Sequence, residues 1–138
     1  MSRAELSAGA AATATTLVAE ADLADEVALD AGDVFPAVYA TSRMIALMEV
    51  AAARVLTSIL EAGENSVGVT VDIEHTSPTP AGARVTAEAR YLGREGKLYL
   101  FEVLARDDAG IIGKGRHRRA IVEAKRLEAS AGRRRKPA

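Results

Sequence analysis

The 138-residue sequence contains no cysteine, no tryptophan and only two histidines, His75 and His117. Without cysteine there can be no disulfide, thiol nucleophile or cysteine-ligated metal, and two histidines make a multi-histidine metal site unexpected. Aromatic residues are 4% of the chain while hydrophobic residues are 49%, so aliphatic side chains and alanine must fill the core. We therefore expect a single domain with an aliphatic core and no metal site.

Neither a strong charge excess nor a long apolar run is present. The net charge is −1, which gives no overall attraction to nucleic acid or anionic lipid. No apolar run approaches the roughly 20 residues of a membrane span. The first residues also lack the leucine-rich segment typical of a signal peptide. The expectation is a cytoplasmic protein with no nucleic-acid or membrane partner.

One long stretch, residues 41–63, has helical character and contains no glycine or proline before Gly63. Thr41 is expected to cap its start. Apolar side chains recur at helical spacing along one face: Ile45, Met48, Ala52, Val55, Leu56 and Ile59. Glu49 lies at the edge of this stripe, and no cation stands three or four residues away. Its carboxylate either bends out to water or requires a partner from another element.

The rest of the chain predicts strands. Before the helix, residues 13–19 favour a strand; after it, residues 67–75, 84–92, 97–106 and 111–124 read as four strands joined by turns, including a hairpin turn at 93–96. One long amphipathic helix can cover one face of a curved sheet. The order is typical of the α+β hot-dog fold, a five-stranded antiparallel sheet wrapped around one central helix. Its exposed sheet edges favour a homodimer.

The end of the chain is basic. We predict a hot-dog domain over residues 1–127, followed by a solvated, disordered tail over residues 128–138.

Three polar residues are candidates for catalysis: Thr41 at the helix start, Glu49 two turns later, and His75 at the end of the next strand. A carboxylate can attack a carbonyl or activate water, and an imidazole exchanges protons near neutral pH. A hydroxyl can orient the substrate or a water. By spacing alone this pattern is weak, and a structural role for His75 beside the following proline-rich turn is then the favoured interpretation. His117 is interpreted as structural.

Several separated motifs resemble the fluoroacetyl-CoA thioesterase family of hot-dog proteins. They agree in order and spacing from about residue 35 to about residue 123: Phe35-Pro36-Ala37-Val38-Tyr39-Ala40-Thr41, Leu47-Met48-Glu49, Val67-Gly68, His75-Thr76 and Thr79-Pro80-Ala81-Gly82. The resemblance implies a hot-dog dimer that hydrolyses a small acyl-CoA thioester at a dimer-interface cleft. Coenzyme A is then part of the substrate, and no separate cofactor is implied.

The resemblance also implies residue roles. Thr41, Glu49 and His75 match the family's catalytic triad, while Phe35, Gly68 and Arg119 match positions that bind or surround the substrate. Two departures from the family pattern concern the acyl pocket: Val50 replaces a tryptophan of the type member, and Gly32-Asp33 replaces a more aromatic lid. The triad is intact, but the acyl group is not specified by the motifs.

A second class of function fits the same fold. A non-catalytic hot-dog module can bind acyl-CoA or another apolar ligand without hydrolysing it. A carboxylate and a histidine together favour the enzyme, because a pure binding module has no need of them.

Overall fold

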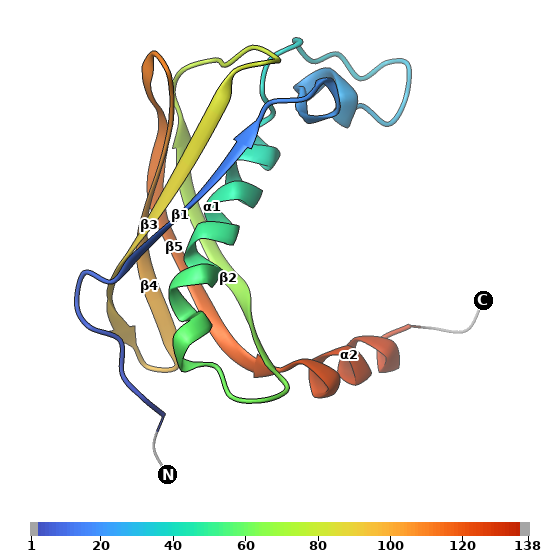
Figure 1. Ribbon diagram of the computed structural model, residues 1–138. Helices are drawn as coiled ribbons and strands as arrows, with labels where there is room; N and C mark the ends of the chain where they lie inside the picture. The colour runs from blue at the N-terminus through green and yellow to red at the C-terminus, as the bar shows by residue number, and fades with distance from the viewer. Residues whose placement is uncertain (1–2, 136–138) are drawn as a thin grey trace.

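A five-stranded antiparallel sheet curves around one long helix in the computed structural model, which describes residues 3–135 (Figure 1). The strands are β1 (Ala11–Leu17), β2 (Glu64–His75), β3 (Arg84–Glu95), β4 (Leu98–Asp107) and β5 (Gly110–Glu123). The helices are α1 (Thr41–Leu56) and α2 (Ala124–Arg133), with short 3₁₀ turns at η1 (Glu20–Asp22), η2 (Ala24–Val27) and η3 (Thr57–Ile59). The strand order β1-β3-β4-β5-β2 leaves β1 and β2 at the edges. This is the hot-dog fold that the sequence predicts.

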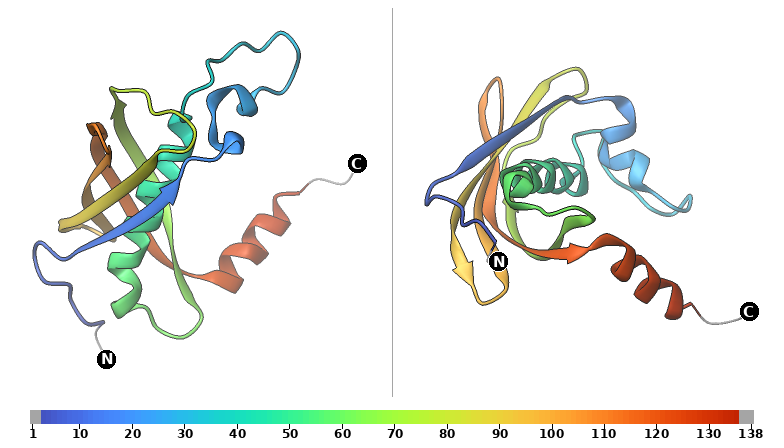
Figure 2. Two further views of the ribbon diagram at one scale, coloured as in Figure 1. Left: turned by 45° about the horizontal axis from the view of Figure 1, so that its top comes forward. Right: turned by 60° about the horizontal axis from the view of Figure 1, so that its bottom comes forward.

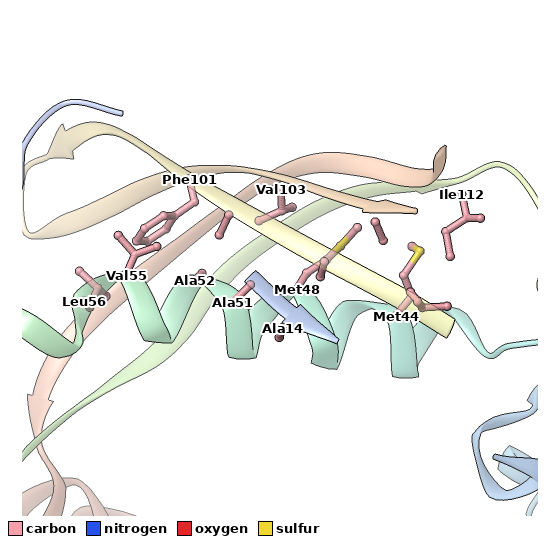
Figure 3. Packing of buried hydrophobic residues seen from close by; sticks show 14 of the residues in the cluster. Ala14, Met44, Met48, Ala51, Ala52, Val55, Leu56, Phe101, Val103 and Ile112 are labelled. Atoms are coloured by element: carbon pink, nitrogen blue, oxygen red, sulfur yellow. The ribbon is translucent and has the colours of Figure 1, made fainter. Parts of the chain in front are cut away.

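The core lies between α1 and the concave face of the sheet (Figure 3). The predicted apolar stripe is confirmed except at its start, where Met44 is buried and Ile45 is only half-buried. Opposite the helix, the strands contribute Phe101, Val103 and Ile112, together with alanines at 87, 89 and 105. Small side chains allow the helix to approach the sheet closely, which explains how a chain with few aromatics fills its core.

Helix α1 differs from the prediction at both ends. Its N-cap residue is Ala40, without a side-chain cap, and Thr41 is instead the first helical residue, so the capping role predicted for Thr41 is wrong. The helix ends at Leu56 rather than near Gly63, and η3 follows it. At this end the Thr57 hydroxyl donates a hydrogen bond to the Ala53 carbonyl. Such side-chain bonds compete with the backbone hydrogen bonds of the helix.

Three strands, β2, β3 and β5, carry bulges that the alternating pattern does not reveal. The β2–β5 register shifts between Gly68 and Thr70, the β3–β4 register between Tyr91 and Gly93, and the β4–β5 register between Ala105 and Arg106. The predicted hairpin turn at 93–96 therefore lies later, at residues 96–97, with Gly96 at φ 62°. Each bulge inserts one residue and bends its strand.

Two segments project from the helix-covered side at opposite ends of α1, namely residues 20–36 and α2 (Figure 2). Helix α2 corrects the prediction of disorder from residue 128, because residues up to 133 are helical. Its alanine, leucine, glutamate, lysine and arginine residues are strong helix formers, a preference that the charge pattern obscured. The domain boundary at residue 127 stays a prediction, and residues 136–138 of the predicted tail lie outside the described residues. No helix within residues 3–135 is long and apolar enough to cross a membrane.

Candidate active site

The first residue of α1 and the last residue of β2 meet through their side chains. Thr41 Oγ1 lies 2.8 Å from Nδ1 of His75. The other ring nitrogen, Nε2, is buried, and the described residues provide no hydrogen-bond partner for it. Burial lowers the pKa of His75 below its ordinary value of 6.5, because desolvation disfavours the charged imidazole. The ring is therefore neutral at pH 7, with Nε2 left over for a further partner.

A cavity of about 360 Å³ adjoins this pair. Thr41 and His75 are both in its lining, with apolar walls from Phe35, Pro36 and Tyr39. Phe35 is 48% exposed, which is unusual for a phenylalanine and places an apolar ring at the edge of the cavity. The structure thus brings together three of the six predicted site residues: Phe35, Thr41 and His75.

Glu49 lies two turns further along α1 and has a different partner. Its Oε2 atom is 3.0 Å from Nη1 of Arg119 on β5. The sequence left open whether Glu49 bends to water or is paired, and the structure shows the ion pair. The Arg119 side chain is only 7% exposed, whereas that of Glu49 is 40% exposed. The arginine is thus held inside the fold, while the carboxylate it pairs with reaches the surface.

Arg119 is held by four hydrogen bonds to neighbouring groups. Its Nε donates to the Ser66 hydroxyl, Nη2 to the Ser66 carbonyl, and Nη1 to both Glu49 and Nε2 of His117. A guanidinium has five N–H groups, and four are used here. Arg119 was predicted to bind substrate; its contacts within the protein leave at most one N–H for that purpose.

Gly68 lies directly beside the Glu49 carboxylate. A Cβ atom at this position would be 2.6 Å from Oε2 of Glu49 and 3.1 Å from Cε1 of His117. Side-chain carbons essentially never approach other atoms so closely, so the backbone of β2 can lie against the carboxylate only because residue 68 is glycine. Gly68 and Glu49 therefore form one unit of the site.

The Thr41–His75 pair and the Glu49–Gly68 unit are well separated within one chain. Thr41 and Glu49 are eight residues apart on α1, which places their Cα atoms about 12 Å apart along the helix axis. Gly68 and His75 are separated by roughly 20 Å of extended strand. Thr41 with His75, and Glu49 with Gly68 and Arg119, thus form two distinct clusters in a single protomer.

Two residues that contact Arg119 of the second cluster, Ser66 and His117, were not predicted as functional. Ser66 gives no signal in the sequence, because its contact with Arg119 depends on the pairing of β2 with β5. His117 was interpreted as structural. The alternation of His117 and Arg119 on a strand does place both on one face, and this signal was available in the sequence.

The overall similarity to known proteins agrees with these observations. Residues 18–125 match the family described as fluoroacetyl-CoA-specific thioesterase (FlK). The chain belongs to this family.

The fluoroacetyl-CoA thioesterase of Streptantibioticus cattleyicolor is 39% identical over 95 residues, which are 69% of this chain and 68% of that protein. A crystal structure of the fluoroacetyl-CoA thioesterase FlK superposes with a TM-score of 0.90 at 30% identity, covering 96% of this chain and all of the other. A hot-dog-like protein from Thermanaerovibrio acidaminovorans shares the fold alone, with a TM-score of 0.78 at 21% identity over 96% of each chain. Family membership identifies the chain as a thioester hydrolase acting on acyl-CoA, as the motifs predict.

Proposed function

We propose that the chain hydrolyses a short acyl-CoA to the free acid and coenzyme A, with Thr41, Glu49 and His75 as the catalytic residues. The observation that carries this proposal is the Thr41–His75 hydrogen bond, which orients a neutral imidazole whose Nε2 is buried and has no partner within residues 3–135. A buried polar atom without a partner is costly, so it is expected to serve a group that arrives with the substrate or with a second subunit.

We propose a homodimer in which each active site combines the two clusters. Strand β2 is a free edge in the protomer, and its Val69 and Val71 side chains are about half exposed. Pairing of β2 edges across a two-fold axis would cover these valines. Because the two strands run antiparallel in such a pair, the Gly68 region of one lies towards the His75 end of the other. Glu49 of the partner subunit then supplies the carboxylate beside Thr41 and His75.

Two routes lead from the thioester to the free acid and coenzyme A. In the first, the Glu49 carboxylate attacks the thioester carbonyl, the C–S bond breaks, and the thiolate of coenzyme A takes a proton; water then hydrolyses the resulting anhydride. In the second, Glu49 removes a proton from water, the hydroxide attacks the carbonyl directly, the C–S bond breaks, and the thiolate of coenzyme A takes up the proton. The His75 imidazole carries the proton in both routes, and Thr41 holds the ring. We assign stabilisation of the oxyanion to a backbone N–H beside Gly68.

The predicted substrate-binding residues have distinct proposed tasks. Phe35 lines the cavity next to Thr41 and contacts the acyl group, and Gly68 allows the substrate carbonyl to approach the backbone next to Glu49. Arg119 acts through its hold on Glu49 and through its remaining N–H. The relative in S. cattleyicolor is named for fluoroacetyl-CoA. The resemblance implies that Val50, in place of a tryptophan, lies near the acyl pocket, so we propose short acyl-CoAs as the class.

The direct test is thiol release from a panel of short acyl-CoAs, including acetyl-CoA and fluoroacetyl-CoA. Wild type and Glu49→Gln are compared, with Glu61→Gln as a matched control because Glu61 is a solvent-exposed glutamate just beyond the same helix. We expect turnover by wild type and Glu61→Gln, and a loss of at least about 100-fold in Glu49→Gln. Full turnover by Glu49→Gln would remove Glu49 from the mechanism. No turnover by folded wild type would favour the non-catalytic binding module.

A further inference from the structure

His117 has a defined tautomer in the folded chain. Its Nδ1 lies 2.8 Å from the Thr70 carbonyl, and its Nε2 lies 3.0 Å from Nη1 of Arg119. A carbonyl can only accept a hydrogen bond and a guanidinium can only donate one. The proton is therefore on Nδ1, Nε2 is the acceptor, and the imidazole is neutral. At 1% exposure this side chain is sealed from water.

His117 and Arg119 together hold both sides of the bulge in β2. His117 binds the carbonyl of Thr70 after the register shift, and Arg119 binds the carbonyl and hydroxyl of Ser66 before it. Gly68 lies between these two anchors, and Oε2 of Glu49 lies against it. Nη1 of Arg119 is bonded to His117 and Glu49 at once, so the acceptor on His117 fixes the direction in which Arg119 presents its N–H to the carboxylate.

We propose that His117 is a positioning residue for hydrolysis, acting through Arg119 to hold the Glu49 carboxylate against the Gly68 bulge. This inference rests on the proposed function of Glu49. It goes beyond a structural role, because it predicts an effect on turnover that is separate from the effect on folding.

The network depends on the neutral form of His117. A protonated imidazole carries N–H groups on both nitrogens, so Nε2 would then oppose Arg119 instead of accepting from it. Two charged groups face the ring: Arg119 on its own strand and Glu49 from α1. Its paired residues on the neighbouring strands are Phe101 of β4 and Val71 of β2, both apolar. Burial is the main cause of the lowered pKa of His117, and the positive charge of Arg119 lowers that pKa further.

The first test is independent of activity. The chain has only two histidines, so ¹⁵N-histidine labelling gives two imidazole signal sets, and His117→Gln assigns them. We expect His117 of the wild type to be the neutral tautomer with hydrogen on Nδ1 at pH 7. A proton on Nε2, or a ring that exchanges between tautomers, would overturn the proposal whether or not Glu49 is catalytic.

The second test uses two substitutions that each keep one half of the imidazole. In His117→Asn the amide N–H replaces Nδ1 and retains the bond to Thr70, but no acceptor reaches Arg119. In His117→Gln the amide oxygen occupies the position of Nε2 and restores that acceptor. We expect kcat to fall about 10- to 100-fold in His117→Asn with KM changed less than about 3-fold, and His117→Gln to recover most of the loss.

The outcomes separate this inference from the proposed function. Loss of turnover in Glu49→Gln, with wild-type kcat in a folded His117→Asn, overturns the positioning role alone. Full turnover in Glu49→Gln overturns the proposed function, while the tautomer measurement still tests the network. Equal losses of kcat in the Asn and Gln variants, in proportion to their loss of thermal stability, would mean that His117 serves the fold only.

Discussion

The hydroxyl of Thr41 lies 2.8 Å from Nδ1 of His75, so the first residue of α1 and the last residue of β2 form one polar unit. Thr41 does not cap α1, because Ala40 is the N-cap, and His75 is the last residue of β2. Neither helix nor strand therefore requires the contact between the two side chains. The bond fixes the orientation of the ring and leaves Nε2 for another group.

Two substitutions of Thr41 distinguish the effect of its hydroxyl from the effect of its side-chain shape. Thr41→Val removes the bond to His75 with little change in volume, and we expect kcat to fall at least about 10-fold because the imidazole loses its fixed orientation. Thr41→Ser retains the hydroxyl and is expected to stay within about 3-fold of wild type in kcat. Steady-state kinetics on the preferred acyl-CoA measures both variants. Because Thr41 is exposed and does not cap the helix, their melting temperatures should agree; equal kcat values in Val and Ser variants would contradict an orienting role for the hydroxyl.

Gly68→Ala introduces the atom for which the site has no room. The new Cβ would lie 2.6 Å from Oε2 of Glu49, so the carboxylate must move, and we expect a loss of about 100-fold in kcat. Gly132→Ala in α2 is the matched control, because a Cβ there meets nothing within 4 Å. Thiol-release assays compare the two variants. A fully active Gly68→Ala would show that the position of the carboxylate is not critical.

Both histidines should make stability fall on acidification. Their native pKa values lie below the ordinary value of 6.5, chiefly because of burial, so the unfolded chain binds protons more readily than the native one. Their contribution to stability is therefore complete above pH 6.5 and is lost as the pH falls through the lowered native pKa values. Thermal melts from pH 7.5 to pH 5 should show a steeper decline for wild type than for His117→Gln, whose amide does not titrate. Parallel curves would contradict the lowered pKa of His117.

The aliphatic core should be sensitive to truncation at the helix–sheet contact. Leu56 is completely buried, and Leu56→Ala is expected to reduce the free energy of unfolding by about 2–5 kcal/mol, because it removes apolar contacts and leaves a cavity. Leu127→Ala on α2, where the leucine is 43% exposed, should change it by less than about 0.5 kcal/mol. Urea denaturation gives both values. Similar losses at the two positions would mean that α2 is covered in solution by something beyond the protomer.

The sequence predicts the fold because apolar residues recur at helical spacing along α1 and at every second position along β2. The stripe along α1 and the alternation in β2 lead directly to one helix on one curved sheet. The bulges in β2, β3 and β5 were missed, since an inserted residue depends on how a strand pairs and leaves no mark in its own alternation. The Thr41 cap was wrong for a related reason: a hydroxyl at a helix start can bind the first turn or a neighbouring strand, and only the position of His75 decides which.

The sequence was sufficient to identify the residues of the candidate site, but not how they are arranged in space. Glu49 could be identified as a carboxylate in need of a partner, yet Arg119 as that partner follows only from the packing of β5 against α1. The sequence places Thr41, Glu49 and His75 in one constellation through family resemblance. A single protomer holds them in two clusters, and that separation results from helix rise and strand length, which spacing in the sequence does not display.

We propose that each active site takes Thr41 and His75 from one protomer and Glu49 from the other. Subunit mixing tests it most directly: His75→Gln and Glu49→Gln proteins, each inactive and each confirmed as a folded dimer, are unfolded together in equal amounts and refolded. If the site is shared, each mixed dimer contains one site without a substitution, and random mixing should restore about a quarter of wild-type thiol release. If all three residues act within one protomer, no mixed dimer has an intact site, and the mixture stays as inactive as its parents.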